Sequence, residues 1–218
     1  MKALEVKTAF SMQQGALEEV SSKLAQHGTK LISITGSAGS GKTTFIQAVL
    51  EHCPDPSAIA VITADPCSNI DGERIARHGA QVVQLVAPEA SVLDGGMLVS
   101  ALNELDLTGI AWLFVENLGT LIFPNDYFLE EQLSILVFSV AEGTDKPAKY
   151  PNAFKAADII FINKIDLIPF TDFDLKHCTK HITAINPSAL LLNGSTKRLS
   201  TMESIWDHIK RKLETKGR

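Results

Sequence analysis

Short apolar runs alternate with segments of helical periodicity along most of this chain. Seven runs are rich in Ile, Val, Leu and Phe: residues 31–35, 58–63, 81–85, 111–116, 134–140, 158–163 and 189–193. Several of them are almost continuously apolar, which is typical of strands buried on both faces of a mostly parallel sheet. The alternation predicts an α/β fold with a doubly wound sheet flanked by helices, and ligands at the carboxyl ends of the strands.

The segments between these runs carry the spacing of amphipathic helices. Leu17, Val20 and Leu24 predict a helix before the first strand, and Gly28 is a plausible stop. We therefore expect an N-terminal helical extension over residues 1–28 and a single globular domain over residues 29–218. Further helices are predicted over residues 70–78, 94–105, 172–185 and 200–212.

The last predicted helix has both a start signal and a buried face. Ser200 and Glu203 have the spacing of a capping box. An apolar stripe follows at helical spacing and is expected to pack on the sheet. The stripe consists of Met202, Ile205, Trp206, Ile209 and Leu213.

A glycine-rich segment directly follows the first apolar run and opens a helical stretch at Thr44. It reads Gly36, Ser37, Ala38, Gly39, Ser40, Gly41, Lys42 and Thr43, which matches G-x-x-x-x-G-K-[ST] completely. Such a loop points backbone N–H groups at phosphate oxygens, and the helix N-terminus adds partial positive charge. Lys42 can reach the β- and γ-phosphates and the Thr43 hydroxyl can bind Mg²⁺. The chain is therefore expected to bind a nucleoside triphosphate.

A second motif, Asn163-Lys164-Ile165-Asp166, follows the apolar run 158–163. A carboxylate only accepts hydrogen bonds, so Asp166 can take both the ring N–H and the exocyclic amine of guanine. Adenine offers no such pair of donors, and the mismatch would leave buried groups unpaired. Lys164 can lie along the base and ribose, and Asn163 can tie this loop to the phosphate loop. We expect GTP rather than ATP, and a second base-contacting loop at Ser195, Thr196 and Lys197.

Two acidic residues end strands on the side where the phosphates are expected. Asp65 ends the second predicted strand and Glu116 ends the fourth. Mg²⁺ prefers hard oxygen ligands and keeps several waters, so Asp65, Glu116 and Thr43 are its expected ligands. The alternative is that these are ordinary strand-end acids that cap a helix or face solvent.

Bulk properties narrow the class of protein further. The chain has 218 residues and a formal net charge of −5, without the basic footprint that a nucleic-acid groove needs. We find no apolar segment of signal-peptide length and none long enough to span a bilayer. The only cysteines are Cys53, Cys67 and Cys178, a sparse and odd set that fits a reducing cytoplasm. We expect a cytoplasmic protein with neither nucleic acid nor membrane as its partner.

Several segments together resemble a known family, the hydrogenase nickel-incorporation GTPase of the HypB type. They are residues 64–65 and 71–75 (A-D and D-G-E-R-I), 115–119 (V-E-N-L-G), 142–151 (E-G-T-D-K-P-A-K-Y-P) and 157–169. The segment at 142–151 discriminates best, because the related urease accessory GTPase reads differently there. The resemblance covers about residues 30–210.

The resemblance implies a SIMIBI-like G domain that hydrolyses Mg²⁺·GTP, dimerises when loaded with GTP and assists nickel insertion into [NiFe]-hydrogenase with other maturation proteins. Lys42 would stabilise the transferred charge, while Thr43, Asp65 and Glu116 would organise Mg²⁺. Either Asp65 or Asp71 can orient the attacking water. Nucleotide-dependent ordering of residues 65–74 would be the switch.

The chain departs from the family at its nickel/zinc site. Ser91 and Val92 stand where the family has a Cys-His pair, and Phe123 stands where it has a further cysteine. Nickel and zinc prefer thiolate and imidazole, so we expect no nickel or zinc site of the family type. Two relocated alternatives are His177 and His181, at i and i+4 beside Cys178, and Cys67 meeting its mate in a dimer.

The sequence leaves three functions open. The first is a GTPase switch in metalloenzyme maturation that acts through protein contacts rather than through a nickel site of its own. The second keeps the GTPase and changes the client to another metalloenzyme. The third is a scaffold that binds nucleotide without turnover.

Overall fold

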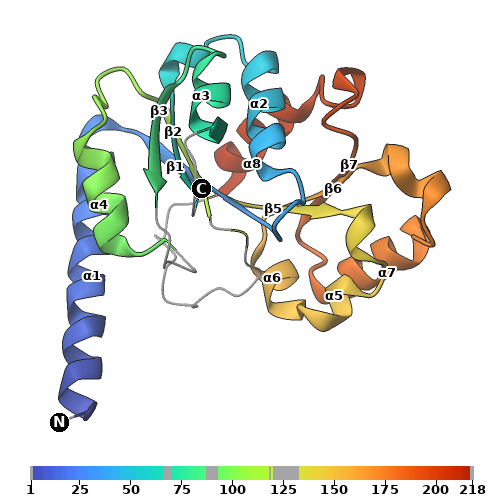
Figure 1. The fold of residues 1–218 in the computed structure, drawn as a ribbon, viewed down its shortest axis with the longest axis horizontal. Coiled ribbons are helices and arrows are strands. Elements are labelled where there is room, and N and C mark those ends of the chain that lie inside the picture. Colours follow the sequence, from blue (N-terminus) through green and yellow to red (C-terminus); the bar gives the residue numbers. More distant parts are fainter. Residues whose placement is uncertain (1, 66–69, 87–92, 118, 120–132, 217–218) are drawn as a thin grey trace.

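Seven parallel strands form one sheet at the centre of the molecule, in the order β3-β2-β4-β1-β5-β6-β7 (Figure 1). The computed structural model describes residues 2–65, 70–86, 93–117, 119 and 133–216, without the side chains of residues 2–14, 65, 199 and 216. The strands are β1 Lys30–Thr35, β2 Ile59–Asp65, β3 Gln81–Val86, β4 Trp112–Glu116, β5 Leu133–Ser139, β6 Ile159–Asn163 and β7 Leu190–Asn193. Each predicted strand is present within two residues of its expected bounds.

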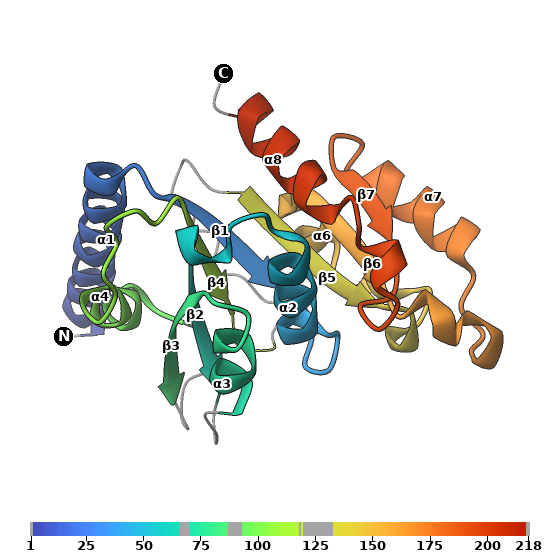
Figure 2. The ribbon, with the colours of Figure 1, turned by 90° about the horizontal axis from the view of Figure 1, so that it is seen from above.

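Helices cover both faces of this sheet, as expected for a doubly wound fold (Figure 2). They are α1 Lys2–His27, α2 Lys42–His52, α3 Ile70–Ala76, α4 Gly95–Asn103, α5 Lys146–Lys149, α6 Pro151–Ala156, α7 Leu175–Ile185 and α8 Ile205–Lys216. Short 3₁₀ turns lie at Pro56–Ala58, Val140–Glu142, Ile165–Phe170 and Leu199–Thr201.

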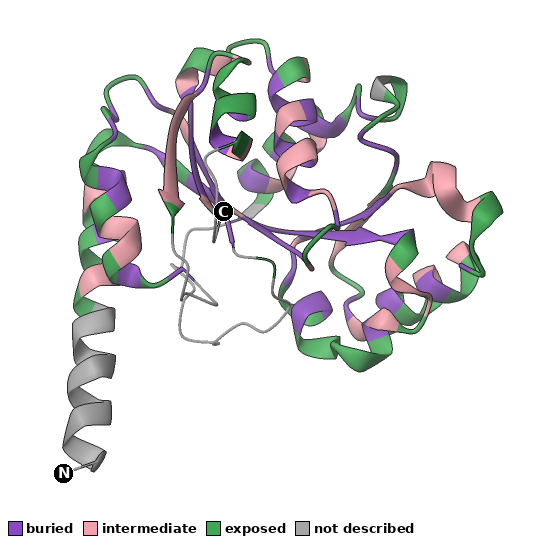
Figure 3. Ribbon diagram, in the orientation of Figure 1, coloured by how far each residue is buried: buried purple, intermediate pink, exposed green. Residues whose placement is uncertain are grey.

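The inner strands β5 and β6 bury side chains on both faces, which explains their nearly continuous apolar sequences (Figure 3). Along β6, Ile159 and Phe161 pack with α2 and α8, whereas Ile160 and Ile162 pack with α6 and α7. The Phe45 and Phe161 rings, 5.0 Å apart, join α2 to the sheet. This packing holds α2, and hence the loop before it, against the middle of the sheet.

The second half of α1 contributes to the core and lies beside α4 (Figure 1). Val20 and Leu24 share a buried cluster with Ala101 and Leu102 of α4. The Lys23 ammonium adds hydrogen bonds of 3.1 Å to the Leu102 carbonyl and 2.7 Å to the Asn103 side chain.

The predicted start of the last helix is wrong, although its apolar stripe is confirmed. All five stripe residues are buried against the sheet. The helix begins at Ile205 rather than Ser200, so Ser200 is not its cap. Upstream, the Thr201 hydroxyl hydrogen-bonds the Ser195 and Arg198 carbonyls, and this local turn holds the chain outside the helix.

Helices α5 and α6, between β5 and β6, carry no periodicity long enough for detection from sequence. Pro147 and Pro151 each lie in a first helical turn, where proline is tolerated because its missing N–H is not needed. The starts of α4 and α7 also shift inward, since Asp94 and Asp174 cap them from outside by accepting N–H bonds from Met97 and His177.

Candidate nucleotide site

The glycine-rich loop joins β1 to α2 at the carboxyl edge of the sheet. The Lys42 ammonium is buried and donates hydrogen bonds to the carbonyls of Gly36 (3.1 Å) and Ser37 (3.3 Å). Burial lowers the pKa of Lys42, while the carboxylates of Glu116, Glu142 and Asp71 partly offset this effect. These hydrogen bonds place the Lys42 side-chain nitrogen inside the loop, where phosphate oxygens are expected.

The motif at 163–166 lies against this loop, as predicted. The Asn163 side-chain amide donates a 2.9 Å hydrogen bond to the Ser40 carbonyl, and the Lys164 ammonium donates a 2.6 Å bond to the Gly39 carbonyl. Gly41 has a φ of 98°, and a Cβ there would overlap the Asn163 amide, so glycine is required on both counts. The 163–166 motif and the phosphate loop, more than 120 positions apart in the chain, are thus hydrogen-bonded to each other.

Ser195 and Thr196, predicted to belong to a second base-contacting loop, lie beside the 163–166 motif. The Thr196 N–H donates to the Asn163 side-chain oxygen at 3.2 Å. A hydrogen bond from Ser195 lowers the pKa of Asp166, so this carboxylate stays ionised. Within the described part of the chain, the buried Asp166 Oδ1 has no hydrogen-bond partner. An ionised carboxylate with one unused oxygen can accept hydrogen bonds from a pair of N–H donors such as those of guanine. Lys197 is exposed at the rim of this loop.

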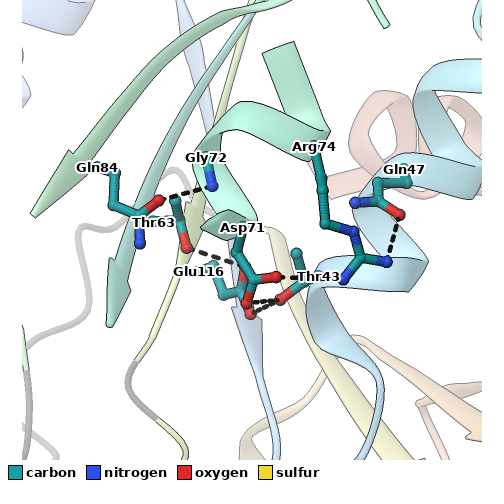
Figure 4. Close-up of polar contacts among 8 residues, drawn as sticks. All are labelled: Thr43, Gln47, Thr63, Asp71, Gly72, Arg74, Gln84 and Glu116. Carbon is teal, nitrogen blue, oxygen red and sulfur yellow. Dashed lines mark hydrogen bonds and ion pairs between the residues drawn. The ribbon is translucent and has the colours of Figure 1, made fainter. Parts of the chain in front are cut away.

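A cluster of oxygen-bearing side chains lies where α2, α3, β2 and β4 meet (Figure 4). The Thr43 hydroxyl lies 2.7 Å from Glu116 Oε1 and 3.3 Å from Asp71 Oδ2, and the Thr63 hydroxyl donates to Glu116 Oε2 at 3.1 Å. Burial raises the pKa of Glu116, while the Thr43 and Thr63 hydrogen bonds and the Lys42 charge act in the opposite direction.

This cluster fits Mg²⁺ by its donor set. Two carboxylates and a hydroxyl converge from different elements, and all are hard oxygen donors. Glu116 is not a solvent-facing acid, since its side chain is buried. Asp65 ends β2 as predicted, but its side chain lies outside the described residues.

Sequence reasoning missed three members of this neighbourhood: Thr63, Gln47 and Gln84. Thr63 lies two positions before Asp65 on the same strand, so strand alternation offered a signal for it. Gln47 and Gln84 lie on α2 and β3 with no motif around them, and only the fold brings them to α3.

Gly119, which follows β4 in the chain, packs against the phosphate loop. The Ala38 N–H donates to the Gly119 carbonyl at 3.1 Å, and a Cβ at Gly119 would lie 2.8 Å from the Ala38 backbone nitrogen. Only glycine allows this close approach. Buried Asn117 connects the same part of the chain to β1, since its N–H donates to the Ile34 carbonyl at 2.9 Å.

The fold gives little support to the relocated nickel or zinc sites suggested by the sequence. His177 and His181 are exposed neighbours on α7 with ring centroids 5.0 Å apart, whereas Cys178 is fully buried on the other side of that helix. Among the described residues, no three His, Cys, Asp or Glu side chains group closely enough to hold a metal ion. Cys67, Ser91, Val92 and Phe123 lie outside the described residues.

The fold and this site define a P-loop nucleoside triphosphatase of the SIMIBI type, with a loop suited to guanine. The family description "CobW/HypB/UreG, nucleotide-binding domain" matches residues 30–193, and the chain belongs to this family. Among the described residues, no helix is both long enough and apolar enough to cross a membrane.

Several similar proteins are named as hydrogenase maturation factors. The chain is 36% identical over 191 residues to a probable hydrogenase maturation factor HypB of Methanocaldococcus jannaschii, covering 88% of this chain and 86% of that protein. It is 34% identical to hydrogenase maturation factor HypB of Rhizobium leguminosarum bv. viciae over 83% of this chain but only 60% of that protein. A crystal structure of HypB from Helicobacter pylori in complex with nickel matches with a TM-score of 0.83 and 25% identity, over 94% of this chain and 96% of that one.

Proposed function

We propose that this chain is a GTPase that assists the assembly of a nickel enzyme, with [NiFe]-hydrogenase as the first candidate client. The preference for guanine is inferred from the Asp166 carboxylate. Ser195 keeps this carboxylate ionised, and the loop that bears it is hydrogen-bonded to the phosphate loop. The choice of hydrogenase as the client enzyme is inferred from the names of the similar proteins. The fold and the sparse cysteines agree with action in the cytoplasm.

Each step of hydrolysis has a candidate residue. The loop N–H groups and Lys42 bind the β- and γ-phosphates, and Lys42 stabilises charge as the bond to the γ-phosphate breaks. Thr43 and Glu116, with Asp65, would hold Mg²⁺, which neutralises charge on the phosphate oxygens when bound. Asp71 projects from α3 toward Thr43 and is our preferred group for orienting the attacking water; Asp65 is the alternative.

Calorimetry with GTP and ATP, followed by phosphate release, tests the enzyme directly. We expect GTP to bind tightly and ATP weakly, and phosphate to be released only with Mg²⁺. Equal affinity for the two nucleotides would contradict the proposal. Single-turnover hydrolysis separates it from a nucleotide-binding scaffold, which would bind GTP and leave it intact.

We further propose that the switch acts through protein contacts, as a GTP-dependent homodimer and with other maturation proteins, rather than through a nickel site of its own. The substitutions Ser91, Val92 and Phe123 support this. Sedimentation with GDP and with a non-hydrolysable GTP analogue tests dimerisation. A client enzyme other than hydrogenase is the second candidate, supported by the same substitutions.

A further inference from the structure

Helix α3 is held from two sides (Figure 4). On one side, the Gly72 N–H donates a 2.6 Å hydrogen bond to the Gln84 side-chain oxygen on β3. On the other side, Arg74 lies 3.3 Å from Asp71 and 3.4 Å from the Gln47 side-chain oxygen on α2. Asp71, between these two attachments, reaches the Thr43 hydroxyl.

The two attachments differ in strength. Arg74 and Asp71 keep 47% and 33% of their side-chain surface exposed, so solvent screens their attraction. The Gly72–Gln84 bond is shorter and partly buried, and it satisfies an N–H of the first helical turn that has no partner inside the helix. Gln84 is therefore the stronger anchor of α3.

Gly72 and Gln84 also fit each other by shape. A Cβ on Gly72 would lie 2.5 Å from the Gln84 side-chain oxygen and 3.0 Å from its Cβ. Gly72 is buried, and the Gln84 side chain occupies the space where a larger residue would project. Moving either partner changes how far α3 lies from β3, and with it the distance from Asp71 to Thr43.

We propose that Gln84 is a positioning residue of the nucleotide site: by accepting the Gly72 N–H, it places Asp71 beside Thr43 for Mg²⁺-dependent GTP binding and hydrolysis. The inference rests on the proposed GTPase function. Gln84 acts through Asp71 and is not itself a catalytic residue. The relationship links β3 directly to the Mg²⁺ side of the site.

The test replaces the acceptor and keeps the volume. In Gln84→Leu, we expect kcat for GTP to fall by about tenfold to 100-fold, because a displacement of about 1 Å at a reacting group has that effect. We also expect Mg²⁺ to enhance GTP affinity less than in the wild type. GTP affinity in EDTA stays within about twofold, because Lys42 and the 163–166 loop are unaffected.

Three further variants separate positioning from general destabilisation. Gln84→Glu keeps an oxygen acceptor for Gly72 and should retain most of the Mg²⁺ effect. Gly72→Ala pushes the Gln84 amide away and should reproduce the Gln84→Leu defect. Gln81→Leu is the matched control, because Gln81 begins the same strand, at the end opposite its carboxyl end, and donates its 2.9 Å bond to the Asp106 carbonyl.

Wild-type kcat and Mg²⁺ response in Gln84→Leu would overturn the proposal. An equal loss in Gln84→Glu, or an equal loss in Gln81→Leu, would also overturn it, since both outcomes indicate a merely structural role. Wild-type protein that binds GTP but never hydrolyses it contradicts the proposed enzyme instead. The Mg²⁺ dependence of GTP affinity then decides the role of Gln84 by itself.

Discussion

The Thr43 hydroxyl and the Glu116 carboxylate, 73 positions apart in the chain, lie 2.7 Å from each other at the edge of the sheet. Thr43 lies in the first turn of α2 and Glu116 ends β4, so the contact joins the end of the phosphate loop to the neighbouring strand. Glu116 is buried and its pKa is raised by that burial, which leaves its charge dependent on the hydroxyls and the cation around it. The pair is the centre of the expected Mg²⁺ site.

Replacing Thr43 by Ala should therefore separate nucleotide binding from turnover. We expect GTP affinity in EDTA to be nearly unchanged, and Mg²⁺-dependent kcat to fall by about 10²-fold or more, as for other losses of groups that stabilise developing charge. Thr43→Ser keeps the hydroxyl and serves as the control. Equal turnover in Thr43→Ala and wild type, measured by phosphate release, would remove Thr43 from the site.

Replacing Asp166 by Asn should change which base is bound. The amide nitrogen donates where the carboxylate accepted, so guanine loses its partner and xanthine, with a carbonyl in place of the amine, gains one. We expect GTP affinity to fall by about 10²-fold or more and xanthosine triphosphate to bind better than GTP. Calorimetry with both nucleotides measures this. Retained GTP preference in Asp166→Asn would show that another residue reads the base.

Adding a methyl group at Gly119 should damage the phosphate loop from behind. The new Cβ would lie 2.8 Å from the Ala38 backbone, which must move together with its N–H group. We expect weaker GTP binding without a change in base preference. Gly15→Ala is the matched control, since nothing lies within 4 Å of its Cβ and it lies within α1. Equal GTP affinity in both variants would contradict the close approach.

Ionisation of Cys178 should lower stability at high pH. Burial raises its pKa to about 12 from an ordinary value of 9.0. The folded protein therefore keeps its thiol proton when the unfolded chain has lost it. This contribution is complete below about pH 9 and is lost as the pH rises toward 12, by at most about 1.4 kcal/mol per pH unit. Urea unfolding of wild type and Cys178→Ala measures it: their difference in unfolding free energy should shrink above pH 9. A difference in unfolding free energy that stays constant with pH would contradict the raised pKa of Cys178.

Nickel and zinc titrations, with and without GTP, should find no tight stoichiometric site. His177 and His181 are exposed and offer two imidazoles, enough only for weak surface binding. A His177→Ala, His181→Ala double variant should remove that weak component and leave GTP hydrolysis unchanged. Tight binding that survives in the double variant would point to a site elsewhere, and binding that needs GTP would point to a dimer interface.

Sequence by itself determined the seven strands, the phosphate loop and the guanine motif. Each is a local pattern: a run of apolar residues, a set of glycines before a lysine, or four consecutive residues after a strand. Such patterns depend only on residues that are close in the sequence, so a single sequence is enough to predict them. The doubly wound order then placed Asp65, Glu116 and Asn163 at the same edge, as parallel strands require.

Only the tertiary structure decided what surrounds those motifs. Thr63 beneath Glu116, Ser195 beside Asp166 and Gln84 under Gly72 are contacts between elements distant in sequence, and no periodicity encodes them. The late start of α8 has a local cause instead: the Thr201 hydroxyl bonds the Ser195 carbonyl six residues earlier, a turn that hydrophobic periodicity does not reveal. A side chain's partner depends on which elements pack together, and packing is a property of the whole fold.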